Sequence, residues 1–234
     1  MTDRDRQPQL EAWLQSGSIY ERKQAIDAFA QWPAEVAVPI LARLATAPEF
    51  LCRRFAVMGL GNHRTDESFQ ALQTLMANEK DQNVLAEIAN ALFDFGDRAI
   101  PLLQELFGRT PHWLTRQTIL SVLMEAHQDE VLLAVIQEAL QDETQTVKET
   151  AILALGSLLN GAVQHQALDL LLQLTQTDHW RDRWRAATAL RLSSSPMARQ
   201  TLARLQQDPN HYVAAAALEA FVSSPTESSD STGS

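Results

Sequence analysis

The chain has 234 residues, of which 45% are hydrophobic and 21% charged, as is ordinary for a protein that buries a core. Its formal net charge of −10 would repel a nucleic-acid backbone or an anionic membrane surface, so we expect neither as a partner. The single cysteine, Cys52, excludes an intramolecular disulfide and a cysteine-cluster metal site. The N-terminus lacks the apolar core of a signal peptide, and no run approaches the roughly 18 apolar residues of a membrane span. We therefore expect a cytoplasmic protein without membrane insertion.

The predicted elements are all helices, because no segment alternates apolar and polar residues for long enough to indicate a strand. We expect residues 1–7 to be disordered and residues 8–222 to form seven helix pairs, each with a first helix A and a second helix B. The predicted A helices cover residues 8–15, 36–47, 66–77, 98–107, 129–140, 162–175 and 196–206. The predicted B helices cover residues 19–32, 50–60, 83–95, 114–126, 146–159, 180–192 and 212–222. Residues 223–234 are rich in serine and threonine and are expected to be disordered.

Two A helices share a proline motif. Residues 37–41 read Ala-Val-Pro-Ile-Leu, and residues 99–103 read Ala-Ile-Pro-Leu-Leu, 62 residues later. We predict that Pro39 and Pro101 lie early in their helices, where the missing N–H costs little.

The B helices share a second pattern, which is clearest at residues 147–156. Two small residues stand three apart and a bulky apolar residue follows, so a neighbouring helix can approach the small face closely. The pattern occurs at Ala25/Ala28/Phe29, Ala56/Gly59/Leu60, Ala151/Ala154/Leu155, Ala186/Ala189/Leu190 and Ala217/Ala220/Phe221, and more weakly at Ile88/Ala91/Leu92 and Thr118/Ser121/Val122. The first small residues are spaced by 31, 32, 30, 33, 35 and 31 positions. This spacing predicts one continuous array of repeats, in which each unit contacts mainly its neighbours.

A two-helix unit of 31 residues, with Ala-Ile-Pro-Leu-Leu in helix A and Val-Lys-x-x-Ala-x-x-Ala-Leu-Gly in helix B, resembles the short HEAT repeat. More narrowly, it is similar to the phycobilisome lyase subgroup of HEAT-like repeats. The resemblance covers roughly residues 8–222 and implies an all-α solenoid, a right-handed superhelix of about seven helix pairs. The subgroup has Asp and then Val-Arg before the small residues, and here this element is degraded. The basic residue is present at Arg22, Arg53, Lys148 and Arg183 and absent at Leu85, Thr115 and Ala214.

In HEAT-like solenoids the B helices line the concave face, where partners usually bind. If the small residues face the core, the exposed row comprises the positions two before and two after the first small residue. This row predicts an apolar strip flanked by arginines, formed by Arg54, Met58, Arg116, Leu120, Glu149, Leu153 and Trp184, with Phe93 and Leu123 beside it. An exposed apolar strip is typical of a protein contact. If the predicted phase is wrong by one position, the same residues belong to the core.

Residues 179–185, His-Trp-Arg-Asp-Arg-Trp-Arg, have the most unusual local composition. Trp and Arg dominate interface hot spots, so we predict that Trp180, Arg183 and Trp184 anchor a partner. The alternative is a stacked contact between repeats. Residues 178–204 hold six arginines and two aspartates, whereas residues 79–149 hold thirteen carboxylates and five cations. This polarity either orients an approaching partner or only solvates the surface.

The sequence shows no convincing catalytic constellation. It has no glycine-rich phosphate loop, no His-Glu-x-x-His and no Gly-x-Ser-x-Gly, and Cys52 is expected to be a buried structural thiol. We therefore predict a noncatalytic scaffold, an adaptor or assembly factor, that holds another protein on its B helices without a resident cofactor or metal. The alternative implied by the resemblance is a bilin lyase subunit or chromophore-handling protein that acts on phycobiliproteins, binds a bilin and works as a heterodimer.

Overall fold

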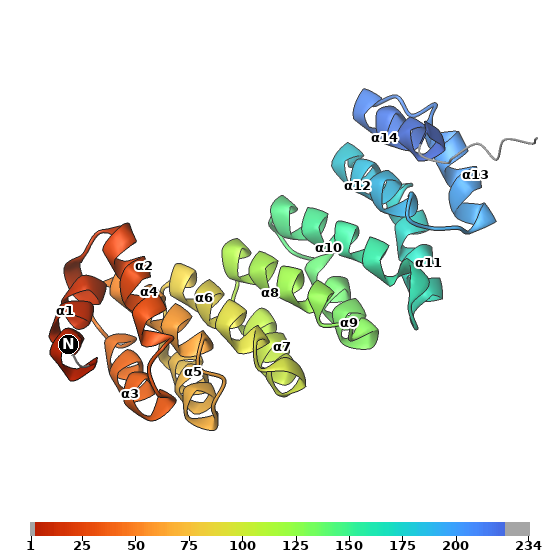
Figure 1. Cartoon of the computed structure of the whole chain (residues 1–234). Coiled ribbons are helices and arrows are strands. Elements are labelled where there is room, and N and C mark those ends of the chain that lie inside the picture. Colours follow the sequence, from red (N-terminus) through yellow and green to blue (C-terminus); the bar gives the residue numbers. More distant parts are fainter. Residues whose placement is uncertain (1–2, 223–234) are drawn as a thin grey trace, which may run out of the picture. The chain divides into compact units, whose positions relative to one another are not determined.

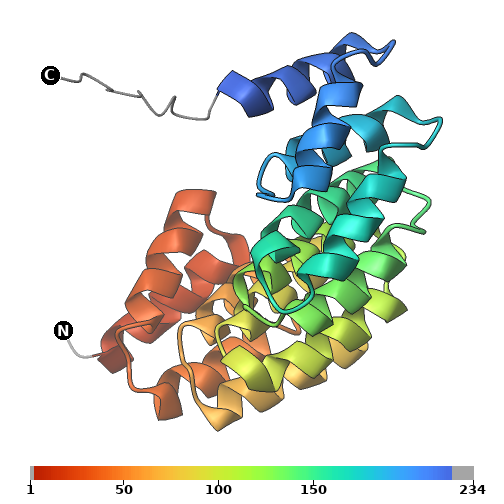
Figure 2. The same ribbon diagram turned by 90° about the vertical axis from the view of Figure 1, so that its right-hand side faces the viewer.

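The computed structural model describes residues 3–222, and every regular element within that range is a helix (Figures 1 and 2). The A helices are α1 (Asp3–Ser16), α3 (Ala34–Leu44), α5 (Asp66–Asn78), α7 (Ile100–Arg109), α9 (Asp129–Ala139), α11 (Gln164–Leu174) and α13 (Pro196–Leu205). The B helices are α2 (Ile19–Phe29), α4 (Phe50–Gly61), α6 (Gln82–Phe93), α8 (Trp113–Glu125), α10 (Gln145–Ser157), α12 (Trp180–Leu190) and α14 (His211–Val222). Two short 3₁₀ helices, η1 (Gly96–Ala99) and η2 (Leu158–Asn160), precede α7 and follow α10. The prediction of seven helix pairs is confirmed.

Several helices begin at a polar side chain that caps them. The Ser18 hydroxyl accepts a hydrogen bond from the backbone N–H of Glu21, and the Glu21 carboxylate accepts one from the backbone N–H of Ser18 at 2.7 Å. Thr65 and Ser68 make the same reciprocal pair at the start of α5. These caps satisfy N–H groups that have no partner inside the helix, and so they define where α2 and α5 begin.

The first helix and one of the prolines differ from the prediction. Helix α1 begins at Asp3, five residues early, so Pro8 lies inside it and residues 3–7 are helical. Pro101 is the second residue of α7, as predicted, but Pro39 is the sixth residue of α3, and its predicted place was wrong. The reason is that the Pro33 carbonyl accepts the N–H groups of residues 36 and 37, which starts α3 earlier. The segment 223–234, expected to be disordered, lies outside the described residues.

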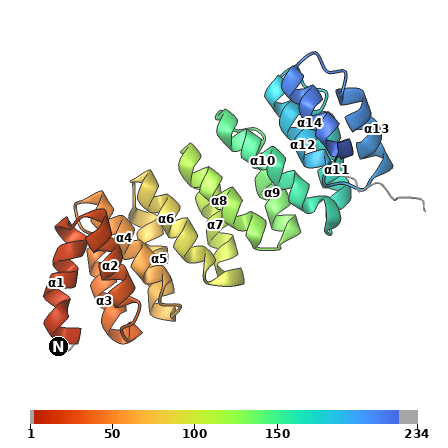
Figure 3. The same cartoon turned by 45° about the horizontal axis from the view of Figure 1, so that its top comes forward.

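The backbone contacts divide the chain into two compact units, with the boundary in the sequence between His127 and Gln128. The first unit contains α1 to α8 and the second α9 to α14. In each unit every A helix packs on its B helix, and neighbouring B helices pack more closely than neighbouring A helices. The B helices therefore form one layer in each unit, as α10, α12 and α14 do in Figure 3. None of the helices described is long and apolar enough to cross a membrane.

Glycine at the end of the B-helix pattern permits this close packing. A methyl group on Gly61 of α4 would lie 3.1 Å from the Ala91 side chain of α6. A methyl group on Gly156 of α10 would lie 3.4 Å from the Ala189 side chain of α12. Both glycines stand five residues after the first small residue of their helix, and both face the second small residue of the next B helix. The Ala-Leu-Gly motif is thus a contact between successive repeats.

The predicted phase is right for the five clear copies of the pattern and wrong for α8. The first small residue of each clear copy is fully buried: Ala25, Ala56, Ala151, Ala186 and Ala217. In α8, Ser121 is exposed and Thr118 half-buried, whereas Ile119 and Val122 are buried. With Ile119 as the first position, the repeat spacings become 31, 32, 31, 32, 35 and 31 residues. The correction makes the repeat more regular.

Candidate functional site

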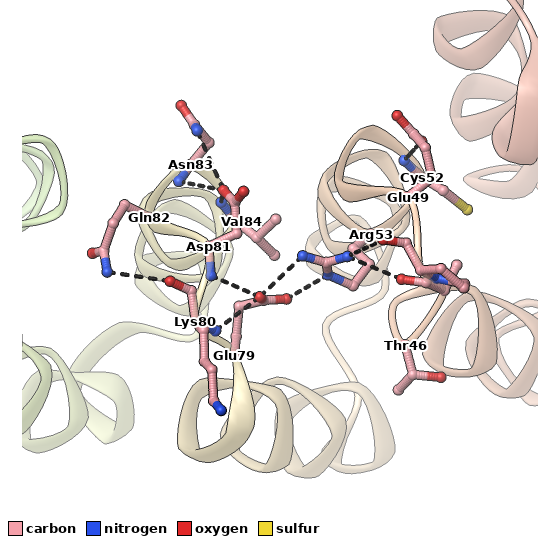
Figure 4. A network of polar contacts seen from close by, with 12 residues as sticks. Thr46, Glu49, Cys52, Arg53, Glu79, Lys80, Asp81, Gln82, Asn83 and Val84 are labelled. Carbon is pink, nitrogen blue, oxygen red and sulfur yellow. Dashed lines mark hydrogen bonds and ion pairs between the residues drawn. The ribbon is translucent and has the colours of Figure 1, made fainter.

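Arginines near the start of the B helices join successive repeats. Arg53 of α4 donates from Nε and Nη2 to the two carboxylate oxygens of Glu79, at 2.7 and 3.2 Å (Figure 4). Its Nη1 donates to the backbone oxygens of Ala47 and Pro48, at 3.0 and 2.9 Å. Burial alone would raise the pKa of Glu79, but hydrogen bonds from Arg53 and from two backbone N–H groups outweigh it and lower this pKa. The guanidinium thus ties the loop of its own repeat to the loop of the next.

Arg183 has the same arrangement in the second unit. Its Nε and Nη2 donate to the two carboxylate oxygens of Asp208 at 2.8 and 2.9 Å, and its Nη1 donates to the carbonyls of Thr177 and Asp178 at 2.9 and 3.0 Å. Only 14% of the Arg183 side chain and 6% of the Asp208 side chain are exposed. The guanidinium that we expected to anchor a partner is therefore engaged within the chain.

Both arginines stand three residues before the first small residue of their helix, and two others share this position. Arg22 of α2 contacts Glu49 at 2.8 Å. Once the phase of α8 is corrected, Arg116 also falls at this position, where we had expected the uncharged Thr115. Arg116 is half-buried, and its guanidinium lies 4.1 Å from the centre of the Phe107 ring. Like Arg183, it belongs to the inter-repeat position rather than to the exposed row.

Helix α6 has Leu85 at this position and joins its neighbour by a neutral contact. The side-chain oxygen of Gln82 accepts hydrogen bonds from the hydroxyls of Thr110 and Thr115, at 3.0 and 3.1 Å. Thr110 and Thr115 are both buried. The degraded motif therefore still joins repeats here, with hydroxyl–amide bonds in place of an ion pair.

The predicted exposed row of the first unit is only partly exposed. Arg54 is exposed and forms an ion pair with Glu87 of α6 at 3.0 Å. Met58 is half-buried and lines a hollow of about 250 Å³ between B helices, and Phe93 is also half-buried. This part of the row is more charged than apolar.

Two leucines of the predicted strip are in the core. Leu120 is 0% exposed and Leu123 is 1% exposed, so their predicted exposure was wrong. The cause is the one-residue shift of α8, which turns Leu120 inward and Ser121 outward.

The second unit gathers four aromatic side chains at the start of α12 and α14. The ring centre of Tyr212 lies 5.4 Å from that of Trp180 and 6.0 Å from that of Trp184, and the two Trp ring centres are 6.0 Å apart. The His211 ring lies 4.1 Å from Tyr212. Trp180 and Trp184 are half-buried and Tyr212 is 50% exposed. We call these four residues the aromatic cluster, and partly exposed aromatic rings of this kind are typical of binding hot spots.

Glu149 of α10 holds two arginines beside the aromatic cluster. Its carboxylate accepts a hydrogen bond from Arg185 Nε at 2.9 Å and lies 3.7 Å from Nη1 of Arg181. The Arg185 guanidinium lies 3.9 Å from the centre of the Trp184 ring, and that of Arg181 lies 5.5 Å from the Trp180 ring. Only 15% of the Glu149 side chain is exposed. Glu149 thus positions the arginines that cover the two Trp rings.

Leu153, one turn further along α10, lines a second hollow of the same layer. This hollow has a volume of about 360 Å³ and is also lined by Ala189 and Leu192 of the α12 repeat and by Ala220 of α14. Leu192 is 60% exposed. Thr188 and Arg191 also line this hollow, so the B face of the second unit carries both apolar and polar side chains beyond the aromatic cluster.

The predicted row omits His211 and Tyr212, because it includes only positions two residues from the first small residue. Positions five and six residues before it, in the first helical turn, hold exposed aromatic residues in several B helices. Those in the first unit are Tyr20, Phe50 and Trp113, with exposed fractions of 70%, 40% and 43%. Extending the predicted row by one helical turn towards the N-terminus of each B helix would have included them, since residues four apart share a helix face.

A family model for HEAT repeats matches the chain in five overlapping windows, residues 8–92, 42–124, 78–156, 101–182 and 132–222. The chain belongs to the HEAT-repeat family. The comparison with curated proteins gave no match. Between residues 3 and 222, no three His, Cys, Asp or Glu side chains lie where they could together hold a metal ion.

Solved HEAT-like structures share the fold. YibA of Escherichia coli is 14% identical, with a TM-score of 0.58 over 96% of this chain and 93% of its own. An archaeal HEAT-like repeats protein from Thermococcus onnurineus is 14% identical, with a TM-score of 0.53 over 91% of this chain and 94% of its own. The complex of CpcE and CpcF of phycocyanin lyase from Nostoc is 18% identical, with a TM-score of 0.47 over 91% of this chain and 85% of the other. At 14% identity the likeness to YibA and to the archaeal protein concerns the fold alone, and nothing is inferred from the lyase complex.

Proposed function

We propose that this HEAT-repeat protein is a noncatalytic scaffold that binds another protein on the exposed face of its B helices, with the aromatic cluster as the main contact. The observation that carries this proposal is the half-exposed set of Trp180, Trp184 and Tyr212 rings in the second unit. Large rings bury much apolar area when a partner covers them, and few rotatable bonds are immobilised. The extended faces of repeat arrays are common binding surfaces.

The rings are also held in place before binding. Trp184 contacts Arg185 as well as the Trp180 and Tyr212 rings, and Glu149 holds Arg185 from the neighbouring helix. A side chain that is already ordered loses less conformational freedom when a partner binds, so more of the contact energy appears as affinity. A rigid aromatic surface of this kind suits recognition better than an acid–base reaction.

A photocrosslinking experiment tests the scaffold. Tyr212 is replaced by p-benzoylphenylalanine, the protein is irradiated in an extract of its native cells, and crosslinked proteins are identified by mass spectrometry. The matched control carries the same group at Gln200, an exposed position of the A helix α13. We expect a discrete product from position 212, absent at position 200 and lost when Trp184→Ala is added. The same products from both positions would count against the proposal.

Bilin handling is the second candidate, and the guanidinium beside the rings favours it. A linear tetrapyrrole combines a conjugated apolar body with propionate carboxylates. The aromatic cluster offers ring edges next to Arg181, half of whose side chain is exposed. In that case the chain would belong to the phycobilisome lyase subgroup and act together with a second lyase subunit. Absorbance during titration with a bilin tests this candidate, and a spectrum equal to the sum of the two components would remove it.

A further inference from the structure

We propose that the aromatic cluster binds an extended segment of a partner protein, in which apolar side chains are flanked by carboxylates. This inference rests on the proposed scaffold function and specifies the chemistry of the segment that is bound. It follows from the spacing of the rings, from the alternation of side chains along an extended chain, and from the exposed arginine beside the Trp180 ring.

The spacing of the rings excludes insertion between them. The ring centres of Trp180, Trp184 and Tyr212 lie 5.4 to 6.0 Å apart. A third flat ring between two others needs about 7 Å, because carbon atoms pack at about 3.5 Å on each side. A nucleobase or another flat ring therefore cannot insert between these rings, and a ligand contacts their exposed parts from outside. Side chains that project from an extended segment can make such contacts.

The distances between the rings give the spacing of the anchors. Trp180 and Trp184 belong to α12, and Tyr212 belongs to the adjacent B helix α14. The Tyr212 ring centre lies 5.4 Å from that of Trp180 and 6.0 Å from that of Trp184. Side chains of an extended chain alternate between its two faces, so residues two apart share a face at a spacing of about 6.6 Å. The segment therefore needs two apolar anchors with one residue between them.

The B face of the second unit is close to neutral, although the whole chain carries −10. Helices α10, α12 and α14, with the capping residue Arg191, hold five cations (Lys148, Arg181, Arg183, Arg185 and Arg191) and three carboxylates (Glu149, Asp182 and Glu219), a net charge of +2. The loop residues Asp208, which pairs with Arg183, and Asp178, which is exposed, bring this sum to 0. The face therefore does not share the negative charge of the whole chain, and it does not repel a segment with carboxylates.

Arg181 provides an exposed cation beside the rings. Its side chain is 50% exposed, whereas those of Glu149 and Asp182 are only 15% and 16% exposed and accept hydrogen bonds from groups of the chain. Asp178, in the loop before α12, is exposed too. The Arg181 guanidinium lies 5.5 Å from the centre of the Trp180 ring, so it can pair with a carboxylate of a segment that is bound on that ring.

The chain itself supplies no better occupant. Residues 223–234 contain the carboxylates of Glu227 and Asp230, but apart from Pro225 they have no apolar side chain that could serve as an anchor. A second copy of the chain would also carry a net charge of −10, and repulsion between two such charges opposes association. A segment of a different protein meets both requirements.

A displayed library of random 12-residue peptides, selected on the full chain, tests the inference. We expect the recovered peptides to share Phe, Leu or Trp at positions two apart, flanked by Asp or Glu. A labelled consensus peptide is then titrated by fluorescence anisotropy against Arg181→Ala and Tyr212→Ala. We expect about tenfold weaker binding to each variant, as for hot-spot truncation. Arg199→Ala, which removes an exposed arginine of the A helix α13, and a chain without residues 223–234 should bind like the parent.

Circular dichroism spectra that match the parent ensure that a loss of binding in a variant does not reflect unfolding. A basic consensus, no enrichment, or unchanged affinity in Arg181→Ala would overturn the inference. So would tighter binding after removal of residues 223–234, which would make that segment the occupant. The scaffold function is judged separately by the crosslink from position 212, so a scaffold that binds a different chemistry would still give that product.

Discussion

Removal of the Arg183 guanidinium should destabilise the second unit. In Arg183→Ala the Asp208 carboxylate loses both bonds from the guanidinium and keeps the backbone N–H of Asn210 at 2.9 Å. The carbonyls of Thr177 and Asp178 lose their donor as well. Removing one partner of a buried ion pair costs about 3–5 kcal/mol, and since this loop borders solvent that can reach the freed groups, we expect about 2–3 kcal/mol.

Urea unfolding followed by circular dichroism measures this loss, with the slope against denaturant unchanged. The matched control is Arg181→Ala, which removes the same group from the same helix. Arg181 is half-exposed and lies 3.7 Å from Glu149, so its removal should lower the free energy of unfolding by no more than about 0.5 kcal/mol. Binding should respond in the opposite order, with the larger effect in Arg181→Ala.

The dependence on pH provides a second check. Hydrogen bonds and charge from Arg183 hold the pKa of Asp208 below its usual value. The stabilisation is therefore fully present above the pKa of Asp in an unfolded chain, about 4, and is lost as the pH falls through the depressed value. Arg183→Ala should weaken this acid dependence. A variant that unfolds like the parent at neutral pH, yet loses its partner, would refute the inter-repeat role and make Arg183 a contact residue.

Three further predictions concern the first unit. Gly61→Ala should lower the free energy of unfolding by about 1–3 kcal/mol, because the new methyl group would lie 3.1 Å from the Ala91 side chain. Gly108→Ala should raise it by about 0.5–1 kcal/mol, because the space around Gly108 is open. Urea unfolding of the two variants measures both changes. Burial lowers the pKa of His63, so the native state favours the neutral ring, and stability should fall as the pH drops below about 6.5. Thermal unfolding should show a smaller acid loss in His63→Gln, and equal losses would contradict this account. Burial raises the pKa of the Cys52 thiol, so a thiol reagent should label Cys52 only on unfolding, and rapid labelling of the folded protein would show the thiol to be accessible.

The fold could be predicted from the sequence because the repeat is encoded by packing residues. A pair such as Ala151 and Ala154 is fully buried, so its spacing marks both the helix face and the period. In α8 this information was ambiguous, since Thr118 and Ser121 are small and Ile119 and Val122 are large. The repeat spacing identifies the correct phase, because with Ile119 as the first position the spacings to the preceding and following repeats become nearly equal, 31 and 32 residues.

The candidate surface was less predictable, because exposure depends on which partner a side chain finds in the next repeat. Arg183 and Trp184 are adjacent in sequence, but Arg183 forms an ion pair with a loop 25 residues later, whereas Trp184 joins the aromatic cluster. Tyr212, in the following repeat, completes that cluster. The sequence showed that Trp and Arg are unusually frequent here, but it could not show which of these side chains are already bound by other residues of the same protein.

The stacked rings of Trp180 and Trp184 also have an optical consequence. Two indoles whose centres are 6.0 Å apart couple their electronic transitions, which produces a paired positive and negative band in the circular dichroism spectrum. The other three tryptophans, Trp13, Trp32 and Trp113, belong to the first unit, so this couplet reports on the second unit alone. A ligand that rotates either indole would change the couplet while the helical signal stays constant. The protein thus carries an intrinsic, label-free reporter at its candidate binding surface.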